Sequence, residues 1–417
     1  MTSTPFKCKS FNNVALGLHF DVHHCVKEIN EREDTFYSHN KGYFNVAMKD
    51  NKSEVGNLKL AGRVVGTIIS ELIFKKFSNH SWTAHYKLPS NGTYKTNIEI
   101  RYLDFNASNY VNSMAYSLNN EVLTNYEFHI AMNESDVPKN DCKSDDFLEG
   151  GHWRAHSPHK LPAKWMLDGG FEKVTENQNK IIDDLNDQLI FEPSDCRIKN
   201  IYELESCVEN KKLENLCFVG DSQMRHLHNM IQSMFTNDTE GFVPPTNHTT
   251  DKVVIYSGSR YFIEDKWAEV AFDYDLCDTI FINFGQWQLS YLRKVDPPSP
   301  FEYAKLVNQT LWTYSTRFPA SKFYFLGTLP HAQNARIYSQ PPIDFRNDIV
   351  LRELNVAGMK ACNHIKHIIG ATRLNCMNLF EMANVVRDLS YDLAHFKAPV
   401  GLQMALAVMT KFCNDRR

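Results

Sequence analysis

The chain has 417 residues, of which 43% are hydrophobic and 23% charged, and its formal net charge at pH 7 is −4. This is the composition of an ordinary globular protein, and the length suggests two or three domains. The small net charge and the lack of any Lys/Arg block exclude the basic surface of a nucleic-acid-binding protein. No apolar run approaches the roughly 18 residues that span a bilayer, so no transmembrane segment is predicted.

Residues 1–140 carry the pattern of an all-β domain. Short runs alternate apolar and polar residues, and turn signals separate them. Thr83–Leu88, the turn Pro89–Gly92 and Tyr94–Leu103 together predict a hairpin. Several strands at this spacing predict an Ig-like β-sandwich.

Residues 141–210 show little periodicity and are predicted to form an irregular connector. The stretch contains Gly150-Gly151-His152-Trp153, several prolines and three cysteines. We expect disulfides to hold it together.

Residues 211–417 alternate between apolar strands and amphipathic helices. This alternation predicts an α/β domain with a parallel sheet and helices on both faces. The predicted strands are Leu216–Val219, Val253–Tyr256, Thr279–Phe284 and Lys322–Leu326, and the predicted helices include Phe301–Phe318, Ile349–Ile368 and Pro399–Phe412.

Ten cysteines and eight N-x-S/T sequons point to the secretory pathway. The even cysteine count permits full pairing, although connectivity cannot be deduced and buried free thiols are the alternative. About four sequons would be expected by chance, so eight favour a glycoprotein of the Golgi lumen, the cell surface or the medium. The first thirty residues lack a signal-peptide pattern, so we expect a targeting segment to be missing from this sequence. The sequon asparagines are Asn51, Asn79, Asn91, Asn106, Asn133, Asn237, Asn247 and Asn308.

The most informative local feature is a Gly-Asp-Ser turn between a strand and a helix. Ser222 follows the strand Leu216–Val219, where helix N–H groups point toward a ligand at the carboxyl edge of a sheet. Its hydroxyl is a candidate nucleophile, and its own N–H could help to hold an oxyanion. The alternative is that Asp221 or Ser222 only caps the helix, since both residue types are favoured caps.

Asp392 and His395 supply the base that such a serine needs. A serine nucleophile requires a histidine to take its proton and a carboxylate to orient that histidine. An Asp three residues before a His on a turn can place the carboxylate against the imidazole. His331 and His226 are rival bases.

Asn283-Phe284-Gly285-Gln286-Trp287 follows another predicted strand. An Asn amide there can donate to a developing oxyanion, and a glycine lets the backbone approach a substrate. A simple strand-to-loop turn would favour the same two residues. No Cys/His cluster has zinc spacing, so we expect neither a metal nor a cofactor.

At residues 140–417 the chain resembles the PC-esterase family of SGNH-like (GDSL-like) acyl esterases and O-acetyltransferases. This family includes the trichome-birefringence-like and the neurexophilin/PC-esterase proteins. The matching segments are Gly150–Trp153, Cys196–Cys207, Phe218–Arg225 (the family's GDSxxR), Asn283–Trp287 (its N-x-G-x-W) and Asp392–His395 (its D-x-x-H). The resemblance implies a three-layer α/β/α domain over 211–417, and an Ig-like domain before it fits the neurexophilin/PC-esterase arrangement.

The resemblance also implies the role of each site residue. Ser222, Asp392 and His395 would form a catalytic triad, with Asn283 and the backbone of Gly258 completing the oxyanion hole. Arg225, Gly285 and Trp287 would bind substrate, although Trp287 could equally be a core aromatic. The plant-specific residues after Ser222 and after His395 are missing, which leaves the sugar acceptor and the acyl donor open.

The expected function is serine-dependent acyl-ester chemistry on a glycan or glycoconjugate. The acyl group would pass to water in an esterase, or to a sugar hydroxyl in an O-acetyltransferase; the sequence leaves both open. The alternative is a non-catalytic SGNH module that binds a glycan or a protein. In a third reading, the β-rich half is the functional part and the second half only supports it.

Overall fold

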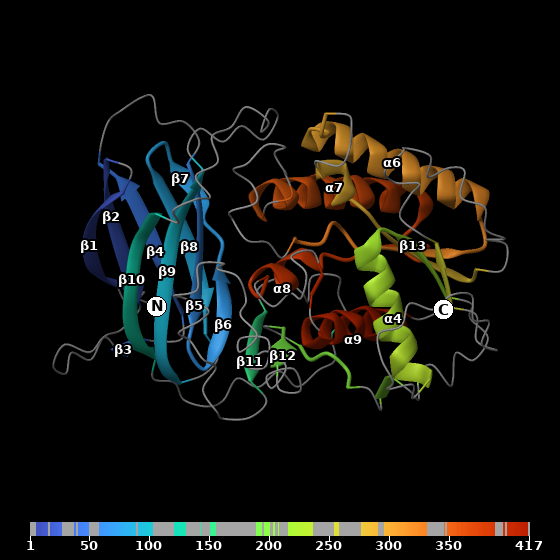
Figure 1. Cartoon of the computed structure of the whole chain (residues 1–417), viewed down its shortest axis with the longest axis horizontal. Helices are drawn as coiled ribbons and strands as arrows, with labels where there is room; N and C mark the ends of the chain where they lie inside the picture. Colours follow the sequence, from blue (N-terminus) through green and yellow to red (C-terminus); the bar gives the residue numbers. More distant parts are fainter. Residues whose placement is uncertain are drawn as a thin grey trace, which may run out of the picture. The chain divides into compact units, whose positions relative to one another are not determined.

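The structure of the protein is a computed structural model. It describes residues 6–15, 17–26, 37–38, 41–49, 58–88, 91–102, 121–130, 142, 151–155, 189–193, 196–200, 203–204, 207, 216–236, 254–257, 277–290, 296–331, 346, 348–387, 395–396 and 398–415. The chain divides into two compact units, one containing strands β1 to β12 and the other containing β13 to β17 with the helices that cover them (Figure 1).

The first unit contains two sheets that are almost entirely antiparallel. The five-stranded sheet has the order β1 (Lys7–Ala15), β2 (Leu18–Val26), β4 (Lys41–Met48), β8 (Ser81–Lys87), β7 (Lys75–Ser78). The seven-stranded sheet has the order β12 (Leu189–Glu192), β11 (His152–Ala155), β6 (Ile68–Leu72), β5 (Lys59–Val65), β9 (Gly92–Tyr102), β10 (Glu121–Ile130), β3 (Tyr37–Ser38). Only the short β3 pairs in parallel, with β10. The prediction of β structure in residues 1–140 is confirmed for the described residues of that range, and its sheets are antiparallel apart from β3.

One hydrophobic core joins the inner faces of these two sheets. Alternate residues of β4 and β8 are buried, as period-2 side-chain alternation requires. Their apolar side chains belong to the same cluster as those of the seven-stranded sheet, with Phe44 and Trp82 on one side and Ile98 and Phe128 on the other.

The predicted hairpin between residues 83 and 103 is wrong. β8 pairs with β4 and β7, whereas β9 pairs with β5 and β10 in the other sheet. The turn signal correctly separated the end of β8 from the start of β9. It could not show that β8 and β9 bury their apolar faces against each other across the core instead of pairing edge to edge.

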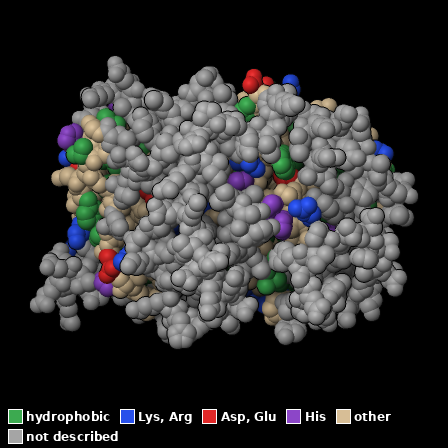
Figure 2. Space-filling view, viewed as in Figure 1, with side chains coloured by type: hydrophobic (Ala, Val, Ile, Leu, Met, Phe, Trp, Pro, Cys, Tyr) green, Lys and Arg blue, Asp and Glu red, His purple; other side chains and the backbone are tan. Residues whose placement is uncertain are grey.

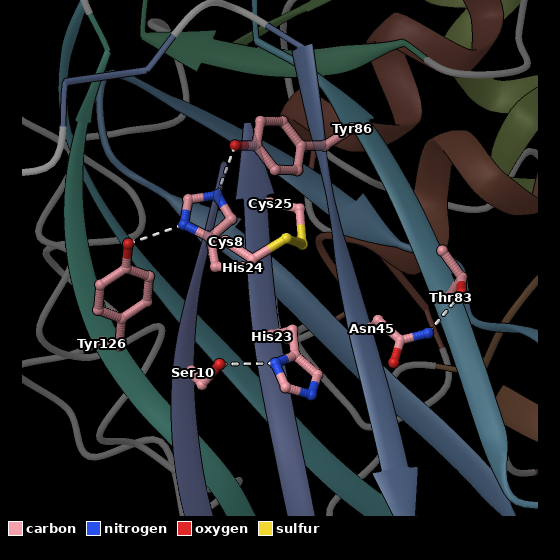
Figure 3. The surroundings of a disulfide bond; sticks show 9 residues. All are labelled: Cys8, Ser10, His23, His24, Cys25, Asn45, Thr83, Tyr86 and Tyr126. Carbon is pink, nitrogen blue, oxygen red and sulfur yellow. Dashed lines mark hydrogen bonds between the residues drawn. A yellow bond between two sulfur atoms is a disulfide. The ribbon is translucent and has the colours of Figure 1, made fainter. Parts of the chain in front are cut away.

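A histidine lies inside this core. His24 bonds through Nδ1 to the Tyr126 hydroxyl (2.7 Å) and through Nε2 to the Tyr86 hydroxyl (2.6 Å) (Figure 3). Its ring stacks on Phe44 with 4.4 Å between centroids. Because a neutral imidazole has one N–H, one tyrosine accepts a hydrogen bond and the other donates. Burial, together with a smaller contribution from the nearby Lys9 charge, lowers the pKa of His24 to about 3.

Two short strands lie in the stretch expected to be an irregular connector. β11 and β12 pair with each other, and β11 also pairs with β6. β11 carries His152 and Trp153 of the Gly-Gly-His-Trp motif; Trp153 is fully buried and His152 contacts Glu192 at 3.2 Å. A Cβ at Gly151 would lie 2.1 Å from the Phe191 ring, so the close packing of Phe191 accounts for that glycine.

The second unit is built on a five-stranded parallel sheet, which confirms the prediction of a mixed α/β architecture. Its order is β14 (Val254–Ser257), β13 (Leu216–Gly220), β15 (Thr279–Asn283), β16 (Lys322–Phe325), β17 (Leu374–Cys376), with every neighbouring pair parallel. β13 and β15 are fully buried, as expected when helices cover both faces of a sheet.

The helices around this sheet fall into two groups. α4 (Ser222–Thr236) packs against α9 (Ala398–Asn414), and α6 (Pro300–Arg317) packs against α7 (Asp348–Ile369). The two pairs lie on opposite sides of the strands (Figure 1). Short helical segments, η4 (Trp287–Leu289) and α8 (Phe380–Asn384), complete the described elements. α6 starts with a capping box between Ser299 and Glu302.

All ten cysteines form disulfides, which fits an extracellular or secretory protein. The pairs are Cys8–Cys25, Cys142–Cys196, Cys207–Cys413, Cys217–Cys277 and Cys362–Cys376. Within the described part of the chain, no helix has the length and apolar character needed to cross a membrane.

Candidate active site

The candidate site begins where two neighbouring parallel strands end. Gly220, the last residue of β13, lies opposite Asn283, the last residue of β15. A Cβ at Gly220 would lie 2.3 Å from the Asn283 carbonyl oxygen and 2.7 Å from the Met224 side chain. Only glycine fits this close approach, and it lets the chain turn directly from the strand into α4.

Asp221 caps α4. Its Oδ1 accepts a hydrogen bond from the backbone N–H of Gln223 at 2.9 Å, and its carbonyl oxygen accepts from the N–H of Arg225 at 3.1 Å. The side chain is almost fully buried, and this desolvation raises the pKa of Asp221 to about 6. The capping alternative raised for the Gly-Asp-Ser turn is therefore fulfilled by Asp221.

Ser222 is the first residue of α4 and is half-buried. Its side chain makes no hydrogen bond to another residue that the structure describes. The positive end of the helix dipole lies at this position and favours a developing negative charge. Because Asp221 provides the cap, the Ser222 hydroxyl is not needed to cap α4.

His395 lies beside this first turn of α4. Its ring contacts that of His226, with 4.3 Å between centroids and an angle of 38° between planes. His395 also interacts electrostatically with Asp221. Histidine and Lys/Arg side chains lie close together on the face of the molecule shown in Figure 2. The structure thus brings a histidine from just before α9 into contact with His226 on α4, near Asp221.

Asn283 is buried at the end of β15, and its amide is already engaged. The Nδ2 group donates to the carbonyl oxygen of Gly327. Gln286 is also buried and donates to the carbonyl oxygens of Leu329 (3.1 Å) and Pro330 (3.0 Å). These bonds tie the segment after β15 to the segment after β16. A primary amide has two N–H groups, so Asn283 has a second one to offer.

Gly285 has a packing explanation. Its φ is +135°, and a Cβ there would lie 2.4 Å from the hydroxyl oxygen of Thr328. That hydroxyl bonds to Tyr303 (2.7 Å), and the Tyr303 hydroxyl also donates to the Phe284 carbonyl (2.8 Å). Burial raises the pKa of Tyr303, and the Asp221 charge adds to the effect. Tyr303 is therefore a neutral hydroxyl near the buried carboxylate.

Trp287 is half-buried and carries a cation on its face. The guanidinium carbon of Arg346 lies 5.9 Å from the centroid of its ring. Arg346 also interacts electrostatically with Asp221, so it lies near the site. Arg225, the arginine predicted from the motif, is exposed on α4. Sequence analysis missed Arg346, because it lies more than a hundred residues from Asp221 and belongs to none of the recognised motifs.

Other predicted site residues have different positions. His331, a rival base, is only 3% exposed at the end of the segment after β16. Asp392 and Gly258 lie outside the described residues, as do the sequons Asn51, Asn106, Asn133, Asn237 and Asn247.

Three sequons lie within the described part of the chain. Asn79 is exposed in the turn between β7 and β8, and Asn91 is exposed just before β9. Asn308 lies on α6, where the hydroxyl of Thr310, the third residue of its sequon, donates to the Leu306 carbonyl at 2.8 Å. Two of the three therefore present an accessible asparagine.

No protein-family model matches this sequence, and no curated protein matches it. Among solved structures, the chain is similar to esterases of the GDSL-like and carbohydrate types. A protein of Parabacteroides merdae assigned as a GDSL-like lipase is 11% identical, with a TM-score of 0.34, covering 48% of this chain and 98% of its own. A carbohydrate esterase family 2 enzyme with a carbohydrate-binding domain from Corynascus thermopiles is 9% identical (TM-score 0.28, 98% of each chain).

An acetyl xylan esterase from Butyrivibrio proteoclasticus is 7% identical, with a TM-score of 0.28 and 97% of each chain covered. At these TM-scores the similarities carry no functional argument.

Proposed function

We propose that this protein is a serine-dependent acyl-ester enzyme that acts on an O-acyl group of a glycan or glycoconjugate. One observation carries the proposal: the His395 ring contacts the ring of His226 on α4, the helix that begins with Ser222. A histidine beside a serine hydroxyl at a helix N-terminus is the arrangement that nucleophilic acyl transfer requires.

In the proposed mechanism, Ser222 Oγ attacks the acyl carbonyl carbon while His395 takes the hydroxyl proton. The resulting oxyanion is stabilised by N–H groups, for which the Ser222 backbone, the second amide N–H of Asn283 and the backbone of Gly258 are the candidates. The C–O bond to the sugar then breaks, and His395 returns the proton to the leaving sugar oxygen. Water or a second sugar hydroxyl attacks the acyl-serine and loses its proton to His395, which regenerates Ser222.

Three further residues support this assignment. Asp392 is assigned as the carboxylate that orients His395, by its place in the Asp-x-x-His motif. Trp287 and Arg346 would form one wall of the substrate site, since their aromatic face and guanidinium suit a sugar ring and its polar substituents. Arg225 and Gly285 are secondary candidates, since Arg225 is exposed and Gly285 is explained by packing.

On the motif resemblance, we assign residues 211–417 to an SGNH-type three-layer domain of the PC-esterase family. Residues 1–140 are proposed as an accompanying Ig-like sandwich, with 141–210 as the connector. The five disulfides support residence in an oxidising compartment, with glycans on the eight sequons. A gel band that does not shift after deglycosylation of protein from secretory cells would refute the glycan assignment.

The test of the nucleophile uses a fluorophosphonate probe and p-nitrophenyl acetate on the full chain. We expect the wild type to be labelled and Ser222→Ala to lose both labelling and turnover. Ser299→Ala is the matched control, because Ser299 also begins a helix but acts only as its cap. Equal labelling of Ser222→Ala and wild type would remove the proposed nucleophile.

Three further outcomes refine the assignment. Full activity in His395→Ala would move the base to His331 or His226. A folded wild type that neither reacts with the probe nor hydrolyses the ester would favour the non-catalytic binding module. Free acetate as the only product from an acetylated glycan would indicate hydrolysis, and acetate recovered on a second sugar would indicate transfer.

A further inference from the structure

The rings of His226 and His395 lie in contact beside the first turn of α4, at 4.3 Å between centroids. Both side chains are half-buried. The contact joins residues that are far apart in the chain, one on α4 and one in the segment before α9. It is therefore a product of the tertiary fold, since no local pattern connects the two.

His226 lies on the same face of α4 as Ser222. His226 lies four residues after Ser222, and residues at this spacing share one face of a helix. Side chains on a helix point back toward its N-terminus, which directs the His226 imidazole toward the turn that carries Ser222. The face of α4 that presents Ser222 therefore also presents the ring on which His395 rests.

A catalytic base needs a narrow range of orientations. A histidine side chain has two rotatable bonds, and its reacting nitrogen must lie about 2.6–3.2 Å from the proton donor's oxygen. The flat face of a neighbouring ring excludes rotamers that would turn the imidazole across it. Asp221 attracts His395 electrostatically, which opposes its movement away from the turn.

We propose that His226 is a positioning residue whose ring holds the His395 imidazole in the orientation that accepts the Ser222 proton. This proposal rests on the proposed function. It gives His226 a role distinct from that of a general base, because His226 acts through His395 and exchanges no proton with the substrate. The ring itself, and not its nitrogens, is what the role requires.

The experiment compares four variants of the full chain: His226→Ala, His226→Phe, His395→Ala and, as the matched control, His364→Ala. His364 is an exposed helix histidine on α7. Misplacement of the base by about 1 Å costs on the order of 100-fold, so we expect His226→Ala to lower kcat for p-nitrophenyl acetate by about 10- to 100-fold. KM should stay within about twofold, because His226 does not bind the substrate.

His226→Phe separates the two possible roles of His226. A phenyl ring keeps the flat face, so we expect activity to return to within about fivefold of wild type, whereas His395→Ala stays inactive. If His226→Phe were as inactive as His395→Ala, His226 would be acting through its nitrogens. Unchanged kcat in a folded His226→Ala would show that the contact has no catalytic role. Should His226→Ala fail to fold, His226→Leu replaces it, since leucine fills the volume without a flat ring.

A readout that does not depend on activity keeps this proposal separate from the proposed function. In imidazole NMR spectra, we expect the His395 ring protons to shift in His226→Ala and to stay near their wild-type positions in His364→Ala. An inactive, unlabelled wild type with this shift would refute the proposed function and leave the contact intact. An active wild type without the shift would refute the contact alone.

Discussion

The two units of this molecule place a histidine in different surroundings. In the first unit, His24 lies in the core, both of its ring nitrogens bond to tyrosine hydroxyls, and aromatic rings pack around it. In the second unit, His395 is half-buried beside the first turn of α4, next to a buried carboxylate. The first arrangement satisfies the hydrogen bonding of a histidine within the core, and the second places a histidine against a helix that begins with a serine.

Sheet geometry explains the difference. Antiparallel strands that share a core direct alternate side chains inward, so a polar residue there must find partners inside. Parallel strands covered on both faces end at a common edge, where loops and helix N-termini converge. Gly220, Asp221 and Asn283 lie at that edge because β13 and β15 end in register. The comparison predicts that changes to His24 in the first unit affect stability alone, whereas changes at this edge affect activity as well as stability.

The largest effect should come from the carboxylate partner of His395. We expect Asp392→Asn to lower kcat by about 10⁴-fold, since it would leave the imidazole in the wrong tautomer. Asp221→Asn should lower kcat far less. An asparagine at this position can still cap α4, and Asp221 is not the carboxylate assigned to orient His395. Steady-state kinetics on both variants test this. A larger loss for Asp221→Asn would make Asp221 the orienting carboxylate.

One disulfide in each unit should stabilise the folded protein by a different amount. Cys207–Cys413 closes a separation of 206 residues and Cys8–Cys25 one of 17. When both cysteines of a pair are replaced by Ser, loop-closure entropy predicts a decrease in the free energy of unfolding. The decrease is about 5 kcal/mol for the first pair and about 3 kcal/mol for the second. Urea unfolding of each double variant measures both. Equal losses would show that strain or residual structure outweighs loop length.

The ionised, buried Asp221 should lower the stability of the protein at neutral and alkaline pH. The pKa of Asp221 is raised from 3.8 to about 6 in the folded state, so the folded state binds this proton more tightly than the unfolded state does. The resulting contribution to the free energy of unfolding is fully present below pH 3.8 and is lost as the pH rises through 6. Asp221→Asn removes this loss, and we expect a gain of up to about 3 kcal/mol in the free energy of unfolding at pH 8 and less than about 1 kcal/mol at pH 4. Asp296→Asn, at an exposed site, should show no such gain. No difference between pH 8 and pH 4 would contradict the burial of an ionised Asp221.

His24 should make the first unit sensitive to acid, with the smallest of these effects. The pKa of His24 is lowered from 6.5 to about 3 in the folded state. The contribution of the neutral His24 to the free energy of unfolding is therefore present above pH 6.5 and is lost as the pH falls toward 3. Between pH 7 and pH 5 we expect a loss of about 2 kcal/mol in the free energy of unfolding. His24→Gln should flatten this dependence, whereas His85→Gln, at an exposed position, should not. Hydrogen exchange in β2 and β4 would localise the effect to this unit.

Local patterns predicted much of the second unit. The apolar runs of β13, β15 and β16 and the amphipathic repeats of α6, α7 and α9 placed those elements within one or two residues. An amphipathic helix repeats about every 3.6 residues, and a fully buried strand is a short continuous apolar run. β17 was missed, since three residues are too short for any period to show. The pairing of β8 and β9 was wrong because both possible arrangements satisfy the same local alternation.

The sequence by itself therefore determined where most strands and helices of the second unit begin and which residues carry reactive groups: Ser222 after a Gly-Asp turn, and His395 near the final helix. Only the tertiary structure decided which of these residues meet. It placed His395 on the ring of His226, Arg346 near Asp221, and the Asn283 amide on Gly327. Each of these contacts joins segments that are distant in the chain. Such contacts depend on how the strands order themselves in a sheet and the helices pack on it, and no short stretch of sequence contains that information.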